Sequence, residues 1–189
     1  MNANLESGCG SAAHFNRRTL LRAAGLGWDV TDYDAGRFES FGLALFTIRN
    51  GRVADLAQGR GRLYAEKLLI SGVDQLAPMH RHNLKVEDII NRGGGTLVLE
   101  LYGAAEDGAL DTSRAAEVWV DGIARTIAPG EKLRLAVGES VTLYPNVWHA
   151  FWAEGDTVLA GEVSTVNDDF TDNVFDPEVP VQLYTIVSS

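Results

Sequence analysis

The chain has very little cysteine, few basic residues and no long apolar run, and each shortage excludes a class of protein. The single Cys9 cannot form an internal disulfide framework, and such a composition fits a reducing cytoplasm. Only 16 lysines and arginines oppose 26 aspartates and glutamates, which gives a formal net charge of −10. Nucleic acids and anionic membranes bind basic surfaces, so this charge argues against both as partners. No apolar stretch approaches the length needed to cross a bilayer.

The length predicts one domain, because 189 residues can bury a hydrophobic core without cross-links. Near the start, Arg17-Arg18 followed by leucines resembles a twin-arginine export signal. Arg22 interrupts the apolar stretch, and no small-residue cleavage site follows. A helix that begins near Ser11 and ends at Gly25 or Gly27 explains the pattern better. We therefore expect residues 1–35 to form an N-terminal helical segment that packs on a barrel of residues 36–189.

From about Gly36 onward, short β-prone segments alternate with turn signals. The expected strands are residues 41–48, 63–70, 89–90, 96–102, 117–120, 123–127, 132–137, 141–151 and 158–166. Asp121-Gly122 predicts a tight hairpin, and the glycine-rich residues 92–95 are interpreted as a tight strand connection. Pro177 and Pro180 argue against a central strand near the end of the chain. Many short strands without interleaved helices predict a mainly all-β fold, an antiparallel sandwich or small barrel.

Three of the four histidines form one pattern with a glutamate. His80 and His82 are one residue apart, and Glu87 follows five residues after His82. His149 lies far downstream, flanked by apolar residues. His80 and His82 share a face of a strand, because side chains repeat every two residues. Three neutral imidazoles and one carboxylate suit Mn, Fe, Co, Ni or Zn and leave room for water or substrate. The pattern therefore predicts a metalloenzyme or a metal-dependent binding module.

This spacing resembles the two sequence motifs of the cupin barrels. The residues that match the first motif are His80, His82, Glu87 and Gly94, and those that resemble the second are Gly138, Pro145 and His149. Three positions depart from the usual residues of these motifs without affecting the ligands, namely Asp74, Val147 and Ala153. The resemblance implies an antiparallel cupin-type β-barrel, or jelly roll, with His80, His82, Glu87 and His149 as metal ligands.

A longer set of segments resembles the D-lyxose isomerase family, also called D-lyxose ketol-isomerases. The segments are residues 25–32 (GLGWDVTD), 45–51 (LFTIRNG), 64–67 (YAEK), 85–95 (KVEDIINRGGG) and 161–169 (GEVSTVNDD). The resemblance implies Mn²⁺-dependent interconversion of D-lyxose and D-xylulose, often with D-mannose and D-fructose as further substrates. Co²⁺ and other divalent ions are alternatives to Mn²⁺. The family resemblance also implies a homodimer of cupin barrels. Its small-molecule partner is a monosaccharide substrate.

An aldose–ketose isomerase needs a base that is not itself a metal ligand. The metal ion polarises the carbonyl and acidifies the neighbouring hydroxyl, and a carboxylate carries the proton through a cis-enediol. Glu162 is the candidate base. If Glu154-Gly155 forms a two-residue hairpin turn, Glu162 lies diagonally from His149, roughly 7 Å away at the backbone. The alternative is an outward-facing charge, since a register slip of one residue reverses the face.

Five further residues are candidates for the pocket: Lys85, Asp168, Asp169, Trp148 and Phe151. Lys85 is assigned to catalysis and substrate binding, because a lysine beside the ligands can stabilise an enediolate; the alternative is a solvated loop lysine. Asp168 is assigned to catalysis and Asp169 to the sugar hydroxyls, with turn residues as the alternative for both. Trp148 and Phe151 are expected to wall the pocket, although aromatic residues on strands commonly belong to the core.

Two other functions fit the same ligand set. The first is a non-haem iron oxygenase of the same fold, which would consume oxygen and form no ketose from D-lyxose. The second is a metal-dependent carbohydrate-binding or regulatory module, which would bind sugar without turnover. No helix-turn-helix segment is visible to support a regulator. We therefore expect a cytoplasmic sugar isomerase that uses Mn²⁺.

Overall fold

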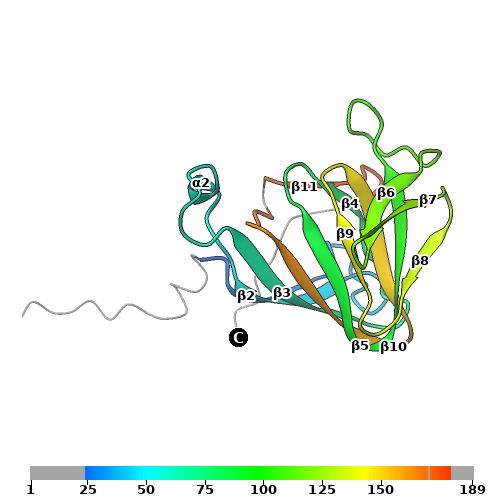
Figure 1. Cartoon of the computed structure of the whole chain (residues 1–189). Helices are drawn as coiled ribbons and strands as arrows, with labels where there is room; N and C mark the ends of the chain where they lie inside the picture. The colour runs from blue at the N-terminus through cyan, green and yellow to red at the C-terminus, as the bar shows by residue number, and fades with distance from the viewer. Residues whose placement is uncertain (1–23, 170, 180–189) are drawn as a thin grey trace, which may run out of the picture.

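The computed structural model describes residues 24–169 and 171–179, which form an almost entirely β-structure (Figure 1). The elements in chain order are β1 (Gly27–Thr31), β2 (Leu43–Arg49), α2 (Val53–Leu56), β3 (Tyr64–Ser71), β4 (Ala77–His82), β5 (Glu87–Gly103), β6 (Ala116–Val120), β7 (Ile123–Ile127), β8 (Lys132–Leu135), β9 (Ser140–Leu143), β10 (Val147–Thr165) and β11 (Asn173–Phe175). All the pairings between these strands are antiparallel. The predicted antiparallel, mainly all-β fold is confirmed. None of the described residues forms a helix with the length and apolarity that crossing a membrane requires.

Two long strands, β5 and β10, lie side by side and connect the two layers of the fold (Figure 1). The second half of β10 pairs with β3, whereas its first half pairs with β4. In the same way, the first half of β5 pairs with β9 and its second half pairs with β8. One layer therefore has the strand order β1-β2-β3-β10-β5-β9-β6-β7, and the other contains β11, β4, β8 and the remaining halves of β10 and β5. The core lies where β5 and β10 fold these layers onto each other.

Both long strands are irregular at the same level, where glycines allow the backbones to approach closely. The register of β10 shifts between Glu154 and Val158, opposite Gly94 and its neighbours in β5. A Cβ added to Gly94 would lie 1.8 Å from the carbonyl oxygen of Thr157, and the φ of Gly94 is +95°. Only glycine fits such a contact and such a dihedral angle. The expected strand connection at residues 92–95 and the expected hairpin at Glu154-Gly155 are therefore wrong, because both segments lie within continuous strands.

The short hairpin was easier to predict because its turn chemistry is local. β6 and β7 pair up to Val120 and Ile123, so Asp121-Gly122 forms the two-residue turn. The φ angles of these two residues are +49° and +79°, as the favoured hairpin turn requires. The predicted Asp121-Gly122 hairpin is confirmed.

The sheet begins earlier than the expected boundary at residue 36. Gly27–Thr31 forms β1, which pairs with β2 at five positions. Apart from its expected end at Gly25 or Gly27, the helix predicted from Ser11 onward lies outside the described residues. The short helix α2 follows β2 after three residues and was not predicted. At the other end, β11 pairs with β4 alone among the described strands, so it is an edge strand next to Pro177.

The inner faces of both layers are largely apolar. Leu97, Leu99, Val118, Leu135 and Val141 are completely buried within the core. Several charged or ionisable side chains are also buried, and six of them line one pocket: Lys67, His82, Lys85, Glu87, His149 and Glu162. Buried charges are costly unless they are paired or bind a ligand, so this pocket is the candidate functional site.

Candidate metal centre and active site

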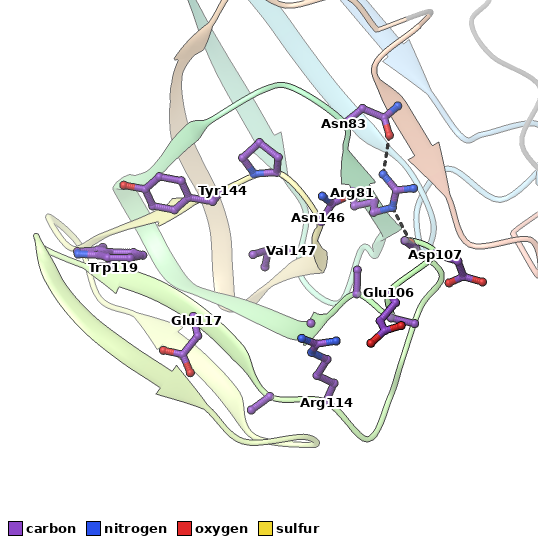
Figure 2. A pocket seen from close by; sticks show the side chains of 16 residues that line it. Arg81, Asn83, Glu106, Asp107, Arg114, Glu117, Trp119, Tyr144, Asn146 and Val147 are labelled. Atoms are coloured by element: carbon purple, nitrogen blue, oxygen red, sulfur yellow. Dashed lines mark hydrogen bonds between the residues drawn. The ribbon is translucent and has the colours of Figure 1, made fainter.

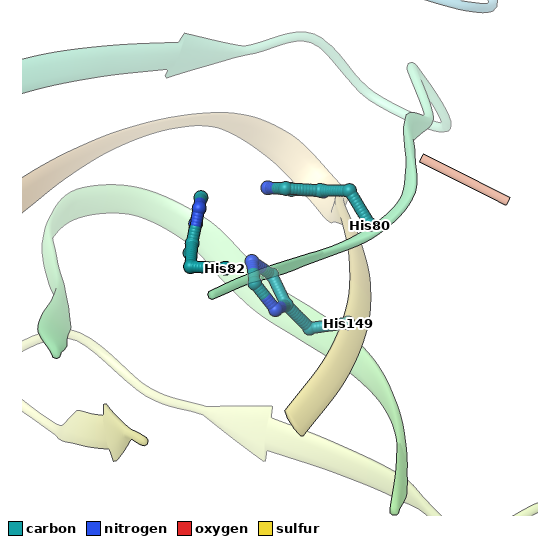
Figure 3. A group of neighbouring side chains, drawn as sticks. All are labelled: His80, His82 and His149. Carbon is teal, nitrogen blue, oxygen red and sulfur yellow. The ribbon is translucent and has the colours of Figure 1, made fainter. Parts of the chain in front are cut away.

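Three histidines meet at the centre of the pocket (Figure 3). His80 and His82 project from β4, and His149 of β10 lies directly opposite His80 in the strand register. The candidate ligand nitrogens of the three side chains all lie within 4.8 Å of one another. The predicted grouping of these histidines is therefore present, and the cluster has the dimensions to hold a metal ion.

Backbone carbonyls orient two of the three imidazoles. Nδ1 of His80 lies 2.8 Å from the carbonyl oxygen of Pro78, and Nδ1 of His149 lies 3.0 Å from that of Val147. Because a carbonyl only accepts hydrogen bonds, each Nδ1 donates its proton and each Nε2 presents a lone pair. Burial, and then the neighbouring His149, hold the pKa of His80 well below its ordinary value. A neutral imidazole with its second nitrogen bound to a carbonyl is the form that ligates metal ions.

Glu87 presents a carboxylate oxygen to the Nε2 atoms of His82 and His149. Its Oε1 lies 3.1 Å from Nε2 of His149 and 3.3 Å from Nε2 of His82. This oxygen is buried, and no described residue donates a hydrogen bond to it. A buried carboxylate oxygen that faces the Nε2 lone pair of His149, with no hydrogen-bond donor among the described residues, is unfavourable unless a cation lies between them. The geometry therefore fits a divalent cation held by Glu87 together with the histidines.

Lys85 connects Glu87 to a second carboxylate. Its Nζ lies 2.7 Å from Oε2 of Glu87 and 3.0 Å from Oε1 of Glu162. Burial alone would raise the pKa of Glu87, but Lys85 and then His82 hold it well below its usual range. Burial alone would lower the pKa of Lys85, but Glu162 and Glu87 together raise it above its ordinary value. Lys85 is therefore a buried ammonium group in the pocket, as predicted, and the solvated-loop alternative is wrong.

Glu162 lies in the same pocket as the histidines but outside their cluster. It is directly opposite Lys67 of β3, whose Nζ lies 3.5 Å from Oε1 of Glu162. Its inward orientation agrees with the prediction, although the expected hairpin does not form. Instead, the irregularity between Glu154 and Val158 changes the inward-facing residues of β10 from odd to even numbers. The bulge in β10 and the expected hairpin both turn Glu162 inward. The predicted orientation is therefore correct, although the predicted hairpin is not.

Lys67 is a site residue that the sequence reasoning missed. Its Nζ donates a hydrogen bond of 2.8 Å to Oδ1 of Asn167 and lies 3.4 Å from Oδ1 of Asp169. Asn50 in turn holds the backbone of Asn167 through two hydrogen bonds. Burial would raise the pKa of Asp169, but Lys67 and Lys85 lower it. Asp169 therefore lines the pocket as an ionised carboxylate, where the prediction placed it.

An apolar wall borders the charged groups on one side. Phe151 contributes to this wall, as predicted, together with Leu43, Leu69 and Ile89. Phe175 of β11 stacks on His80 with 5.4 Å between ring centroids. The wall reduces the access of water to the histidines and lowers the local dielectric constant, which strengthens the electrostatic interactions in the pocket.

Two predicted site residues do not line the pocket. Asp168 accepts hydrogen bonds from the backbone and the hydroxyl group of Thr171, so it is the turn residue that the alternative described. Trp148 alternates with His149 along β10 and therefore faces the other side of the strand. Its Nε1 donates a hydrogen bond of 3.2 Å to the carbonyl oxygen of Gly108, and the guanidinium of Arg81 lies 5.5 Å from its ring. The catalytic role of Asp168 and the sugar contact of Trp148 are not supported.

A second, open hollow is lined by Arg81 of β4, which alternates with His80 and His82 along the strand (Figure 2). It has a volume of about 740 Å³ and includes Arg114 and the aromatic pair Trp119 and Tyr144. The guanidinium of Arg81 is held there by the carbonyl oxygen of Gly108 and the side chain of Asn83. None of the three histidines lines this hollow, so the candidate chemistry belongs to the first pocket.

Fold and site together define the class of protein, a cupin-type barrel with a buried histidine cluster suited to a metal ion. Solved structures agree with the fold. The L-ribose isomerase of Cellulomonas parahominis with L-psicose has a TM-score of 0.56 at 18% identity, over 86% of this chain and 89% of that one. The L-ribose isomerase of Geodermatophilus obscurus has a TM-score of 0.56 at 21% identity, over 82% and 81%. At these identities the likeness concerns the fold alone.

The chain belongs to the D-lyxose isomerase family, whose model matches residues 12–186. The D-lyxose/D-mannose isomerase of Serratia proteamaculans is 51% identical over 154 residues, and that of Escherichia coli O157:H7 is 46% identical over 153 residues. Each alignment covers 79% of this chain but only 65% and 66%, respectively, of the relatives' lengths. The family resemblance predicted from the sequence is confirmed.

Proposed function

We propose that this protein is an aldose–ketose isomerase that interconverts D-lyxose with D-xylulose and D-mannose with D-fructose. The observation that carries the proposal is Glu162, a buried carboxylate held by Lys67 and Lys85 in the pocket of the histidine cluster. Because Glu162 is not one of the candidate metal ligands, it can act as a base while the metal stays bound. Membership of the D-lyxose isomerase family, and two relatives named D-lyxose/D-mannose isomerase, support the choice of substrates.

The residues that would hold the metal ion are His80, His82, Glu87 and His149. A bound divalent cation supplies polarisation of the sugar carbonyl and acidifies the adjacent hydroxyl. Imidazole and carboxylate ligands accept several first-row metals, so the donor set alone does not select one. Mn²⁺ is proposed from the family resemblance, with Co²⁺ as an alternative.

Glu162 is proposed to remove the proton from C2 of the aldose and to return it to C1 of the cis-enediolate, while the proton of the C2 hydroxyl passes to O1; the two transfers together yield the ketose. Lys67 and Lys85 both contact Oε1 of Glu162, which leaves its Oε2 for the sugar. Lys85 also supplies positive charge where the enediolate develops. Because it contacts Glu87 as well, Lys85 fixes the distance between the base and the metal ligands.

The hydroxyl groups of the sugar need polar partners beyond the reacting carbons. Asp169 offers an ionised carboxylate that accepts hydrogen bonds from hydroxyls, and Asn173 lines the same pocket. The apolar residues Phe151 and Phe175 line the same pocket. A fixed base on one side of a fixed sugar reaches the C2 hydrogen of only one C2 epimer.

Ketose formation from two pairs of epimers tests the proposal. The Mn²⁺-loaded protein is expected to form D-xylulose from D-lyxose and D-fructose from D-mannose. D-Xylose and D-glucose, the C2 epimers of these sugars, serve as matched controls and are expected to react far more slowly. Absence of ketose from all four sugars would refute the isomerase. Oxygen consumption by the Fe²⁺-loaded protein would then indicate an oxygenase, and saturable sugar binding without turnover would indicate a binding module.

A further inference from the structure

One imidazole of the cluster lacks the backbone contact that orients the other two. His80 and His149 each place Nδ1 against the carbonyl oxygen of the residue two positions earlier. Nδ1 of His82 is buried and makes no hydrogen bond with any described residue. The acidic group that faces it is Asp172, whose Oδ2 lies 3.9 Å away. The orientation of His82 therefore depends on a segment some distance along the chain.

Asp172 is itself buried and holds the loop between β4 and β5. Its Oδ1 accepts a hydrogen bond of 2.7 Å from the backbone N–H of Leu84, and its Oδ2 accepts one of 3.0 Å from that of Lys85. Its carbonyl oxygen accepts a third, of 3.1 Å, from the N–H of Asn83. One residue thus satisfies three consecutive donors in the loop that joins His82 to Lys85.

We propose that Asp172 is a positioning residue that orients His82 and Lys85 and thereby sets the affinity of the site for its metal. The proposal rests on the metal centre of the proposed function. Oδ2 of Asp172 faces both the backbone of Lys85 and the outer nitrogen of His82, whose Nε2 faces Glu87. Carboxylates behind ligating imidazoles orient them and tune their affinity for the metal. At 3.9 Å Asp172 makes no hydrogen bond to Nδ1, so it acts on His82 through its charge and through the loop backbone that it holds.

The segment that carries Asp172 has further contacts with the same ligands. Asn173, the next residue, pairs with His82 across β11 and β4. Phe175, two residues later, stacks on His80. The N–H of Asp172 donates to the carbonyl oxygen of Asp168, which anchors the turn before β11. The segment therefore supports two histidines, with Asn173 and Phe175 in the lining of the pocket and Asp172 as its charged contact with the cluster.

Replacing Asp172 with asparagine tests the role, with Asp121→Asn as the matched control. Oδ1 of Asp121 also accepts a backbone hydrogen bond, of 2.8 Å from Ser140, but this residue lies in the β6–β7 turn and does not line the pocket. Both substitutions weaken a capped loop, but only D172N puts an amide N–H₂ or a neutral oxygen behind His82. We expect D172N to raise the Kd for Co²⁺ by about 10- to 100-fold and to change the visible Co²⁺ spectrum. D121N should leave both unchanged.

A wild-type Kd and spectrum for D172N, or an equal weakening by D121N, would overturn the proposal. If D172N does not fold, Asp172→Glu replaces it, because the longer side chain keeps the charge but displaces it from His82. Wild-type Co²⁺ affinity in that variant would also overturn the proposal. The titration needs no sugar. A wild-type protein that binds Co²⁺ but forms no ketose would therefore refute the proposed isomerase activity and leave the proposed role of Asp172 standing. A wild-type protein that binds no Co²⁺ refutes both.

Discussion

The Glu162→Gln variant is expected to lose turnover by about 10²- to 10⁴-fold while it still binds its metal. Glutamine has nearly the same shape and keeps an oxygen for Lys67 and Lys85, but an amide cannot take and return a proton. Glu162 lies outside the histidine cluster, so the metal ligands remain in place. Initial rates with D-lyxose and a Co²⁺ or Mn²⁺ titration measure the two properties separately.

The control for this variant is Glu154→Gln on the same strand. Glu154 is exposed and forms an ion pair of 3.2 Å with Arg134, so the same chemical change there should leave kcat unchanged. Unchanged turnover in E162Q would contradict the mechanism and move the role of the base to Asp169, which also lines the pocket. Loss of metal binding together with turnover would instead make Glu162 part of the metal centre.

The His149→Gln variant is expected to lose metal affinity by at least about 100-fold, and isomerase activity with it. His149 is only 1% exposed, and its Nε2 faces Oε1 of Glu87. Glutamine fills much of the space but offers no imidazole nitrogen. Isothermal titration with Mn²⁺ and a ketose assay at saturating metal would measure the two losses.

Trp148→Phe provides the comparison, since it changes the neighbouring residue on the opposite face of β10. It removes the hydrogen bond to Gly108 but keeps an aromatic ring beside Arg81. Metal affinity and the KM for D-lyxose should stay at wild-type values. A raised KM for D-lyxose in W148F would indicate that Trp148 contacts the sugar after all. Wild-type metal affinity in H149Q would show that His149 is not a metal ligand.

The grouping of the candidate metal ligands was partly predictable, because three of the four follow a local pattern. A period of two residues puts His80 and His82 on one face of a strand, and Glu87 begins the next strand after a short loop. Only His149 comes from far along the chain, and its spacing alone does not reveal that it pairs with His80. The cupin motif supplied that connection.

The glycine-rich run shows why the strand boundaries were harder to predict. Glycines at residues 93–95 and 155 fit turns and close backbone contacts equally well as a sequence pattern. Only the pairing of β5 with β10 shows that Gly94 lies against Thr157 within continuous strands. Glu162 nevertheless faces inward. The bulge shifts the inward-facing positions of β10 by one residue, as the expected hairpin would also have done.

Lys67 and Asp172 were missed because their roles depend on contacts between distant segments. Lys67 faces Glu162 through the register of β3 and β10, which no local signal determines. Asp172 holds the backbone of Leu84 and Lys85 from a loop that resembles any acidic turn in sequence. The same ambiguity made Asp168 look catalytic, although its side chain accepts hydrogen bonds from Thr171 in its own turn and does not line the pocket.

Deuterium transfer is the most direct test of the central claim that Glu162 carries a proton between two carbons of the sugar. The Mn²⁺-loaded protein would be incubated with D-lyxose in deuterated water, and the product examined by mass spectrometry and NMR. A carboxylic acid proton exchanges with solvent, so the account predicts D-xylulose with deuterium at C1. D-Xylulose formed at full rate without deuterium would mean that hydrogen passes directly between the carbons, and would contradict the role assigned to Glu162.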